Sequence, residues 1–204
     1  MEQVLEDFYT EDEIDRIWKE IQYLDSNTYG WEYPNPQINA SNIKTGITKL
    51  QGARQFKFSI FGYNNLELLS KSNIYTSGKK LMNYHDYLVG KHDIYKNIRE
   101  LDCHFSFLNY YYKDDGCYKL HHDISMYTML SYFYEEPKNF TGGQCLVGNN
   151  KYEIHNGFTI VLPGWLNHGS APIKIIDKNR PKSGRYCIAH FFWAVDPEYN
   201  SKKE

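Results

Sequence analysis

Apolar and polar positions near the start of the chain recur with a helical period. Thr10 and Glu13 form a capping-box pattern. The apolar residues after it share one helical face: Ile14, Ile17, Trp18, Ile21 and Leu24. This pattern predicts an amphipathic helix that lies on a core. Residues 65–71 and 79–101 also have a helical pattern, and we expect Gly90 to interrupt the second of these stretches.

The segment after the first helix has the composition of turns. Residues 26–54 are rich in Asn, Pro, Gly and Thr, which predicts a long loop or short strands. Residues 55–61 alternate polar and apolar side chains and predict a strand.

From Cys103 onward the pattern changes to short aromatic or β-branched runs separated by Gly, Asn, Asp or Pro. Examples are "HFSFLNYYY", "KLHHDI", "YTMLSYFYEE", "FTIVLP" and "RYCIAHFFW". Many short strands with regular turn signals predict an all-β barrel or jelly roll. The chain is thus predicted to have a helical N-terminal part that supports a C-terminal β-sandwich.

Composition narrows the class of protein. A chain of 204 residues, 41% hydrophobic and 17% aromatic, fits one packed domain over 1–204. A formal charge of −2 disfavours nucleic acid and anionic membranes as partners. The acidic start lacks a secretory pattern, and no apolar run approaches the roughly 20 residues that span a bilayer. We therefore expect a cytoplasmic monomer whose four scattered cysteines are free thiols.

The run "LHHDIS" contains two histidines beside an aspartate. If this run is a strand, side chains two positions apart face the same way and neighbours face opposite sides. His121 and Asp123 then point together, and His122 points away. A metal bound here would therefore use His121 and Asp123, and not His122.

A third ligand has to come from elsewhere in the chain. His168 follows Asp123 by 45 positions, enough for a hairpin excursion and a return to the adjacent strand. Two histidines and one carboxylate form the facial triad of non-haem Fe(II) oxygenases. Catalytic zinc with the same ligands stays open on ligand type alone. His155, before a predicted Asn-Gly turn, is expected to be exposed and not a ligand.

The last predicted strand carries an arginine. Arg185, Cys187, Ala189 and Phe191 share one face of that strand. A buried arginine requires an anion, because an unpaired internal charge is very costly. An open metal site, an inward arginine and the space left by small neighbours suit a small dicarboxylate. The alternative is that Arg185 pairs with an internal Asp or Glu.

With these features in order, the sequence resembles the prolyl 4-hydroxylase-like branch of the 2-oxoglutarate- and Fe(II)-dependent dioxygenases. The resemblance covers about the C-terminal half, from Phe105 to Trp193, in the blocks "NYYYKDDGCYKLHHD", "TMLSYFYEE", "TGGQCLV", "NGFTIVLPGWLNHGSAPIK" and "GRYCIAHFFW". It implies an α+β, mainly β fold: a double-stranded β-helix (jelly roll) core over 102–196, supported by the helices, loops and first strands of 1–101.

Residue by residue, the resemblance implies that His121, Asp123 and His168 bind Fe(II). It implies that Arg185 and Tyr132 bind the distal carboxylate of the cosubstrate 2-oxoglutarate, and that Tyr111 lies nearer the substrate and iron. Further candidates for substrate contact are Tyr118, Trp165 and Arg54, the last within a 26–63 loop region that also holds Trp31 and Tyr33.

Two departures from the family pattern stand out. The segment between His168 and Arg185 is longer than usual, and its Lys174 and Arg180 are rivals of Arg185 for an anion. Arg185 is preferred because the family's strand pattern follows it. The glycine block reads Gly142-Gly143-Gln144-Cys145, which puts substrate contacts from this segment in doubt.

The resemblance implies hydroxylation of a C–H bond with O2, with ascorbate as a reductant. It favours peptidyl-proline 4-hydroxylation of a protein or peptide with an exposed proline. Because this fold and triad serve many substrates, a free amino acid or another small molecule is an alternative. A second alternative is a non-catalytic, metal-binding β-sandwich sensor or binding protein.

Overall fold

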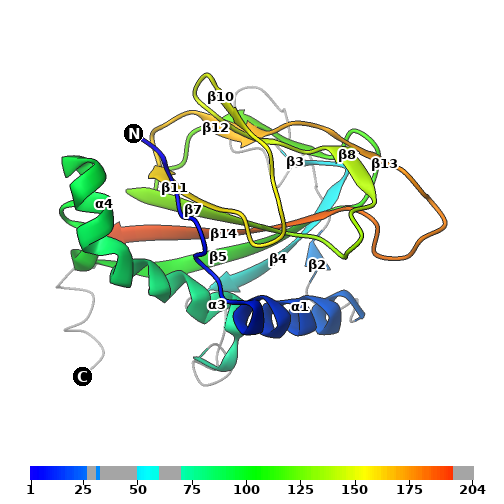
Figure 1. Ribbon diagram of the computed structural model, residues 1–204, viewed down its shortest axis with the longest axis horizontal. Helices are drawn as coiled ribbons and strands as arrows, with labels where there is room; N and C mark the ends of the chain where they lie inside the picture. The colour runs from blue at the N-terminus through cyan, green and yellow to red at the C-terminus, as the bar shows by residue number, and fades with distance from the viewer. Residues whose placement is uncertain (27–30, 33–49, 60–69, 195–204) are drawn as a thin grey trace.

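The structure, a computed structural model, describes residues 1–26, 31–32, 50–59 and 70–194. Two stacked β-sheets form its centre, and helices lie on the outer face of the larger sheet (Figure 1). Among the described residues, no helix combines the length and apolar character needed to cross a membrane.

The larger sheet has seven strands, each antiparallel to its neighbours. Its spatial order is β1 (Gln3–Val4), β11 (Thr159–Pro163), β7 (Tyr127–Phe133), β14 (Arg185–Ala194), β5 (Leu101–Tyr111), β4 (Ala53–Ser59) and β2 (Trp31–Glu32). β14 lies between β5 and β7, so both edges of this strand are hydrogen-bonded within the sheet.

The smaller sheet has five strands in the order β10 (Asn150–Tyr152), β9 (Cys145–Val147), β12 (His168–Ser170), β6 (Cys117–His121) and β3 (Leu50–Gln51). A separate pair joins β8 (Phe140–Gly142) to β13 (Ile173–Ile175). Two facing antiparallel sheets, in which strands distant in the sequence lie side by side, form the predicted jelly roll.

The helical elements precede most of the strands. They are α1 (Glu11–Ser26), α3 (Asn73–Ser77), α4 (His85–Lys91) and the short 3-10 turns η1 (Gly78–Tyr84), η2 (Asp93–Tyr95) and η3 (Ile98–Glu100). The capping box at the start of α1 is confirmed: the Thr10 amide donates to the Glu13 carboxylate at 2.8 Å, and the Glu13 amide donates to the Thr10 hydroxyl at 3.3 Å.

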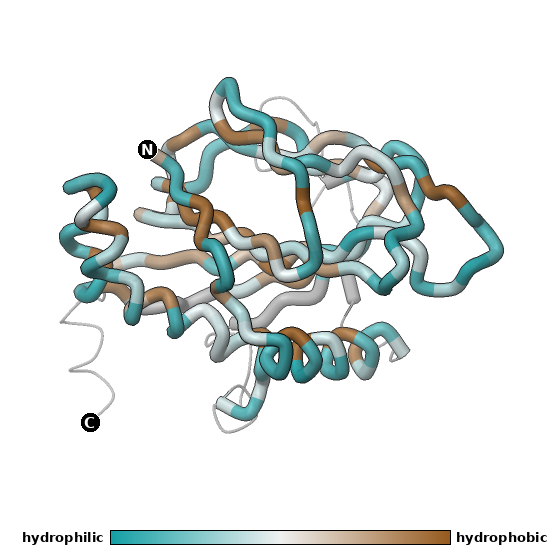
Figure 2. Tube along the Cα trace, in the orientation of Figure 1, coloured by the Kyte–Doolittle hydropathy of each residue, from teal (hydrophilic) through white to brown (hydrophobic). Residues whose placement is uncertain are grey.

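Alternation along β14 separates two hydrophobic clusters. Tyr186, Ile188 and Phe192 pack with the helices, whereas Cys187 and Ala189 face the smaller sheet. Phe191 packs against the same cluster as Cys187 and Ala189, and Arg185 contacts its Tyr111 and Tyr132, so the predicted shared face of Arg185, Cys187, Ala189 and Phe191 is confirmed. Hydrophobic positions follow the central strands and the loop that joins β13 to β14 is mostly hydrophilic (Figure 2). The cluster between the sheets is the one that surrounds the candidate site.

Some local predictions need correction. Gly90 does not interrupt its helix, because α4 continues through it to Lys91. The helix ends there because the backbone of the next residue, His92, is extended. The stretch 79–101 is a series of short α and 3-10 turns instead of one helix. Residues 65–69 lie outside the described residues, and so does most of 26–54. The described cysteine side chains, Cys117, Cys145 and Cys187, are buried and free, as predicted.

The helix-facing side of β14 also carries a buried histidine. The His190 side chain is fully buried, with its Nδ1 2.7 Å from the Ser106 hydroxyl and its Nε2 3.1 Å from the Ser77 hydroxyl. Burial lowers the pKa of His190 from 6.5 to about 3. The imidazole is therefore neutral in the folded protein at neutral pH, and its hydrogen bonds attach α3 to the sheet.

We expect this histidine to make the fold sensitive to acid. Below pH 6.5 the unfolded chain binds a proton that folded His190 does not, so its contribution to stability is complete above 6.5 and is lost as the pH falls toward 3. At roughly 1.4 kcal/mol per unit of pKa difference, the loss is a few kcal/mol. Denaturant unfolding of wild type and His190→Gln between pH 7 and 4 measures it. The stability advantage of wild type should shrink with acid, and parallel curves would contradict the prediction.

Candidate metal centre

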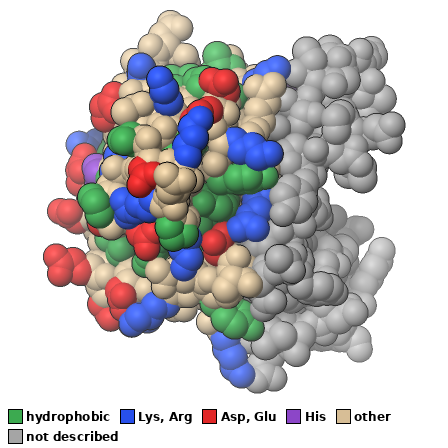
Figure 3. Space-filling model, turned by 90° about the vertical axis from the view of Figure 1, so that its right-hand side faces the viewer, with side chains coloured by type: hydrophobic (Ala, Val, Ile, Leu, Met, Phe, Trp, Pro, Cys, Tyr) green, Lys and Arg blue, Asp and Glu red, His purple; other side chains and the backbone are tan. Residues whose placement is uncertain are grey.

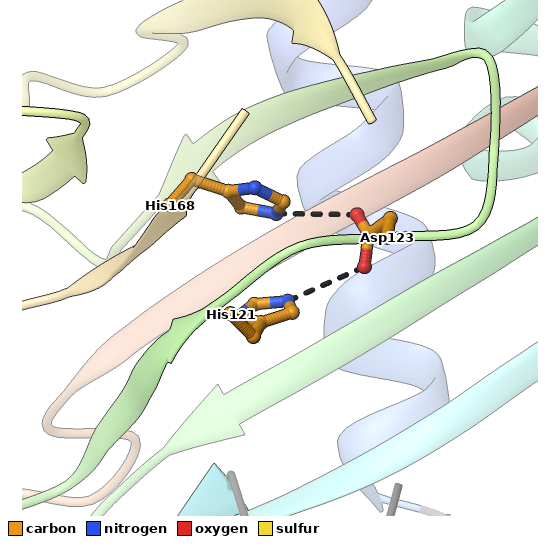
Figure 4. Close-up of side chains that lie close together, drawn as sticks. All are labelled: His121, Asp123 and His168. Carbon is orange, nitrogen blue, oxygen red and sulfur yellow. Dashed lines mark ion pairs between the residues drawn. The ribbon is translucent and has the colours of Figure 1, made fainter. Parts of the chain in front are cut away.

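Two histidines from adjacent strands and one aspartate converge on a single point (Figure 4). His121 is the last residue of β6 and His168 is the first residue of β12, and the two are partners in the strand register. Their Nε2 atoms lie 3.3 Å and 3.1 Å from the two carboxylate oxygens of Asp123. All three potential ligand atoms lie within 4.8 Å of one another.

The orientation of Asp123 has a different cause from the one the sequence suggested. β6 ends at His121, so Asp123 is not in the strand and strand alternation does not orient it. Instead, its amide donates to the Gly164 carbonyl at 2.7 Å, and the Thr128 hydroxyl donates to its carboxylate at 2.6 Å. His122 is exposed. The predicted pair therefore comes together through contacts between loops and across strands.

Backbone carbonyls fix both histidine rings. The Nδ1 atom of His121 lies 2.9 Å from the Lys119 carbonyl, and that of His168 lies 2.8 Å from the Leu166 carbonyl. A carbonyl accepts only, so each Nδ1 is a donor, and each Nε2 faces the carboxylate of Asp123. Two imidazole nitrogens and a carboxylate that converge on one point are the arrangement of a metal site.

Electrostatics favour an ionised carboxylate in this cluster. Burial alone would raise the pKa of Asp123, but hydrogen bonds with His121 and His168 outweigh it and hold the pKa well below its ordinary value. Burial lowers the pKa of His121, partly offset by Asp123. One carboxylate and two imidazoles are a mixed N/O donor set without thiolate, which suits Fe(II) with open positions.

Arg185 is the largest fully buried side chain of the described residues. It starts β14, and its Nη2 donates to the Ser170 hydroxyl at 2.8 Å and its Nη1 to the Gly143 carbonyl at 2.5 Å. Its Nε–H is buried without a hydrogen-bond partner, and Arg185 forms no ion pair with a described carboxylate. Within the described part of the chain, the alternative of an internal Asp or Glu partner is not realised, so the charge calls for an external anion.

Three predicted tyrosines lie around these groups. The guanidinium carbon of Arg185 is 4.1 Å from the centre of the Tyr111 ring and 5.4 Å from that of Tyr132. Burial raises the pKa of both hydroxyls well above 10, so they stay protonated donors. The Tyr118 ring lies 4.4 Å from the His121 ring. All three line one cavity together with the cluster and Ser170.

The sequence argument missed the roles of two residues that contact Arg185. Ser170 lies two positions after His168 in the same strand, so the period of two could have placed it on the same face. Gly143 has a φ of +76°, and a Cβ there would come within 3.2 Å of the Arg185 guanidinium. The segment Gly142-Gly143-Gln144-Cys145 therefore contacts Arg185 through the backbone carbonyl of Gly143.

Other predicted residues lie apart from the cavity. Arg54 is paired in register with Tyr110, and it forms an ion pair with Asp25 on the helix side of β5. It is therefore not brought to the cluster, because the alternation of β4 turns it to the opposite face. His155 is exposed, and its Nδ1 lies 3.2 Å from the Asn156 carbonyl. Tyr33 and the side chain of Trp31 lie outside the described residues.

The two rivals of Arg185 have other surroundings. Lys174 is exposed on β13. Arg180 donates to the carbonyls of Glu136 and Pro137 at 3.0 Å and 2.5 Å. Neither residue lines the cavity of the cluster, whereas three residues that contact Arg185 do: Ser170, Tyr111 and Tyr132.

Exposed apolar side chains flank the cluster. Ile124 is 91% exposed, Trp165 57% and Met126 41%, although water disfavours all three. The Gly164 amide donates to the Met126 carbonyl at 2.9 Å, and a Cβ at Gly164 would lie 1.9 Å from the Ser125 carbonyl oxygen. This close approach places the loop of Trp165 against the loop of Asp123, so the apolar rim is attached to the metal-ligand loops.

Comparisons with known proteins agree with this geometry at the level of structure. A scan against protein-family models found no match, and a search of the curated proteins found no similar sequence. Solved structures do match. A prolyl hydroxylase from Trichoplax adhaerens, in complex with a hypoxia inducible factor oxygen degradation domain peptide fragment, has 12% identity and a TM-score of 0.61 over 95% of this chain and 83% of that chain.

Two further matches come from bacteria. A prolyl-4-hydroxylase from Pseudomonas putida has 14% identity and a TM-score of 0.54 over 96% of this chain and 93% of that chain. EctD from S. alaskensis, solved with 2-oxoglutarate and 5-hydroxyectoine, has 15% identity and a TM-score of 0.50 over 95% and 72%. This protein therefore has the fold of 2-oxoglutarate- and Fe(II)-dependent oxygenases, and it carries a His-Asp-His cluster. Prolyl hydroxylases are among its structural neighbours.

Proposed function

We propose that this protein is a 2-oxoglutarate- and Fe(II)-dependent dioxygenase that hydroxylates a C–H bond, with a proline of a protein or peptide as its substrate. One observation carries the proposal: His121, Asp123 and His168 converge on one cavity. The same cavity is lined by Ser170, which accepts a hydrogen bond from buried Arg185. The donor atoms fit Fe(II), and the unpartnered Nε–H of Arg185 fits an anionic cosubstrate.

In this proposal each residue has a defined role. His121, Asp123 and His168 hold Fe(II), which would supply the dioxygen chemistry that converts 2-oxoglutarate to succinate and CO2 as the substrate is hydroxylated. Arg185 binds the distal carboxylate of 2-oxoglutarate, with Ser170 orienting the guanidinium. Tyr111 and Tyr132 cover the guanidinium and keep water from it. The protein thus fixes both ends of the cosubstrate before reaction.

Part of the cavity lining is apolar. Its wall contains Phe107, Leu130, Ala189 and Phe191, and the two phenylalanine rings lie 5.1 Å apart. Such a wall excludes water from the site where the C–H bond would react. The exposed rim of Ile124, Met126 and Trp165 offers apolar contact for a chain that extends beyond the cavity. This favours a polypeptide substrate, and we propose Trp165 and Tyr118 as substrate contacts.

A small-molecule substrate is the second candidate, because EctD is a structural neighbour whose structure contains 5-hydroxyectoine. A cell-lysate peptide pool and a mixture of free amino acids, each incubated with Fe(II), ascorbate and 2-oxoglutarate, separate the two. A gain of 16 Da on proline residues, absent without 2-oxoglutarate, supports peptidyl hydroxylation. The same gain on a free amino acid supports the alternative. Absence of any iron-dependent succinate release contradicts the oxygenase proposal and leaves the metal-binding sensor.

A further inference from the structure

A second, larger cavity lies on the other face of β5. It has a volume of about 700 Å³ and shares no lining residue with the cavity of the metal cluster. Tyr110, which lines it, packs in the cluster of side chains beneath the helices, whereas Tyr111 packs between the sheets. The alternation of β5 therefore separates the two sites. A volume of several hundred Å³ is typical of a small-molecule site.

Basic side chains predominate in this cavity. Four basic residues, Arg54, Lys113, Lys178 and Arg180, face two acidic ones, Asp25 and Asp114. The local charge is thus positive, although the whole chain has a net charge of −2. Figure 3 views the end of the molecule with the loop between β13 and β14, where Lys and Arg side chains, with some Asp and Glu, lie around hydrophobic side chains. Such a local field attracts anions.

Internal ion pairs neutralise only part of this charge. Arg54 pairs with Asp25, and Lys178 pairs with Asp114 at 2.7 Å. Lys113 lies 5.3 Å above the Tyr112 ring and forms no ion pair with a described carboxylate. For Arg180 the closest described carboxylate oxygen is on Glu135, at 3.9 Å. Among the described residues, Lys113 therefore has no carboxylate partner, and Arg180 has only the long contact with Glu135.

The loop that contributes Lys178 and Arg180 is held in place. Besides the carbonyl contacts of Arg180, the Asn139 side chain donates to the Asp177 carbonyl at 2.9 Å, and the Ser183 hydroxyl donates to the Arg180 carbonyl at 2.6 Å. The extra length between His168 and Arg185, which the proposed oxygenase chemistry does not use, builds this wall. These hydrogen bonds hold the backbone of the loop that carries Lys178 and Arg180.

We propose that this cavity is a second binding site, for a small polyanion of the phosphate class. Several oxygens on one compact anion match the cations contributed by the β5–β6 loop and by the β13–β14 loop. Tyr110 and Tyr112, with ring centres 5.5 Å apart, add an aromatic floor against which an organic part of such a ligand rests. Polycarboxylates share the anionic chemistry, so they form the second arm of the test.

Titration calorimetry of metal-free protein with pyrophosphate, and separately with citrate, tests the site. Lys113→Glu should raise the Kd for pyrophosphate about tenfold or more, and Lys113→Ala should raise it less, because reversal replaces attraction by repulsion. Lys151→Glu is the matched control: Lys151 is exposed on β10, outside this cavity, and the variant has the same net charge. Its Kd should stay within about twofold of wild type. Higher salt should weaken binding to wild type.

The outcomes are distinguishable from those of the oxygenase proposal, because no turnover is measured. Tighter binding of citrate than of pyrophosphate, with the same Lys113 dependence, would assign the site to carboxylates and overturn the phosphate class. No binding, or equal weakening by Lys113→Glu and Lys151→Glu, would overturn the site. Thermal unfolding of each variant confirms that it is folded.

Discussion

Replacement of Asp123 by alanine is expected to abolish iron-dependent succinate release, whereas replacement of His122 by alanine is expected to leave it unchanged. Asp123 contributes the anionic ligand atom of the cluster, and both histidine rings are aimed at its carboxylate. His122 is adjacent in sequence but exposed. We expect a loss of about 10³ or more for Asp123→Ala, because two imidazoles without the carboxylate hold Fe(II) weakly.

The experiment measures both turnover and metal content. Succinate is quantified with purified variants at saturating 2-oxoglutarate, and bound iron is measured after anaerobic loading. Asp123→Ala should lose both signals, and His122→Ala should keep both. If the His122 variant loses iron while the Asp123 variant keeps it, the ligand assignment is wrong. If both variants keep iron and turnover, the cluster is not the metal site of the reaction.

The second large effect is expected at Arg185. Arg185→Lys should raise the KM for 2-oxoglutarate by about two orders of magnitude, because lysine keeps the charge but loses the planar fork that pairs two N–H groups with a carboxylate. The replacement also removes the hydrogen bonds that the buried guanidinium donates to Ser170 and Gly143. Ser170→Ala removes only one of these contacts, so we expect a smaller rise of about fivefold.

Arg99→Lys is the matched control for this prediction. Arg99 is exposed and pairs with Asp86 at the surface, so its replacement should leave the KM for 2-oxoglutarate at the wild-type value. Iron affinity should also stay unchanged in Arg185→Lys, since Arg185 is not a metal ligand. An unchanged KM in the Arg185 variant would remove Arg185 from cosubstrate binding and reopen the question of which cation binds the distal carboxylate.

Several features of the fold and site follow from local patterns in the sequence. The capping box and the apolar positions of α1 set the start of that helix and the face it buries, because both depend on residues within two turns of one another. The alternation of β14 puts Arg185, Cys187 and Ala189 on one face for the same reason. The distance between Asp123 and His168 in the sequence allowed adjacent strands, and the register of β6 and β12 bears this out.

Other features depend on which strand pairs with which. The sequence around Arg54 has a strand pattern, but this pattern does not say which face of the sheet the side chain lies on. The pairing of Arg54 with Tyr110 puts it on the face toward α1 and the second cavity. Gly90 has low helix propensity, yet α4 continues through it. No local sequence pattern could predict the hydrogen bond from the Asp123 amide to the Gly164 carbonyl, because the two residues are far apart in the sequence.

The sequence by itself determined the helical and strand periodicities, the chemistry of the donor set and the inward face of Arg185. Only the tertiary structure decided how Asp123 is turned toward the histidines, that Ser170 and Gly143 hold Arg185, and that the loop between β13 and β14 builds a second basic cavity. The physical reason is that periodicity records which side of an element is buried, whereas hydrogen bonds between distant segments determine what meets on that side.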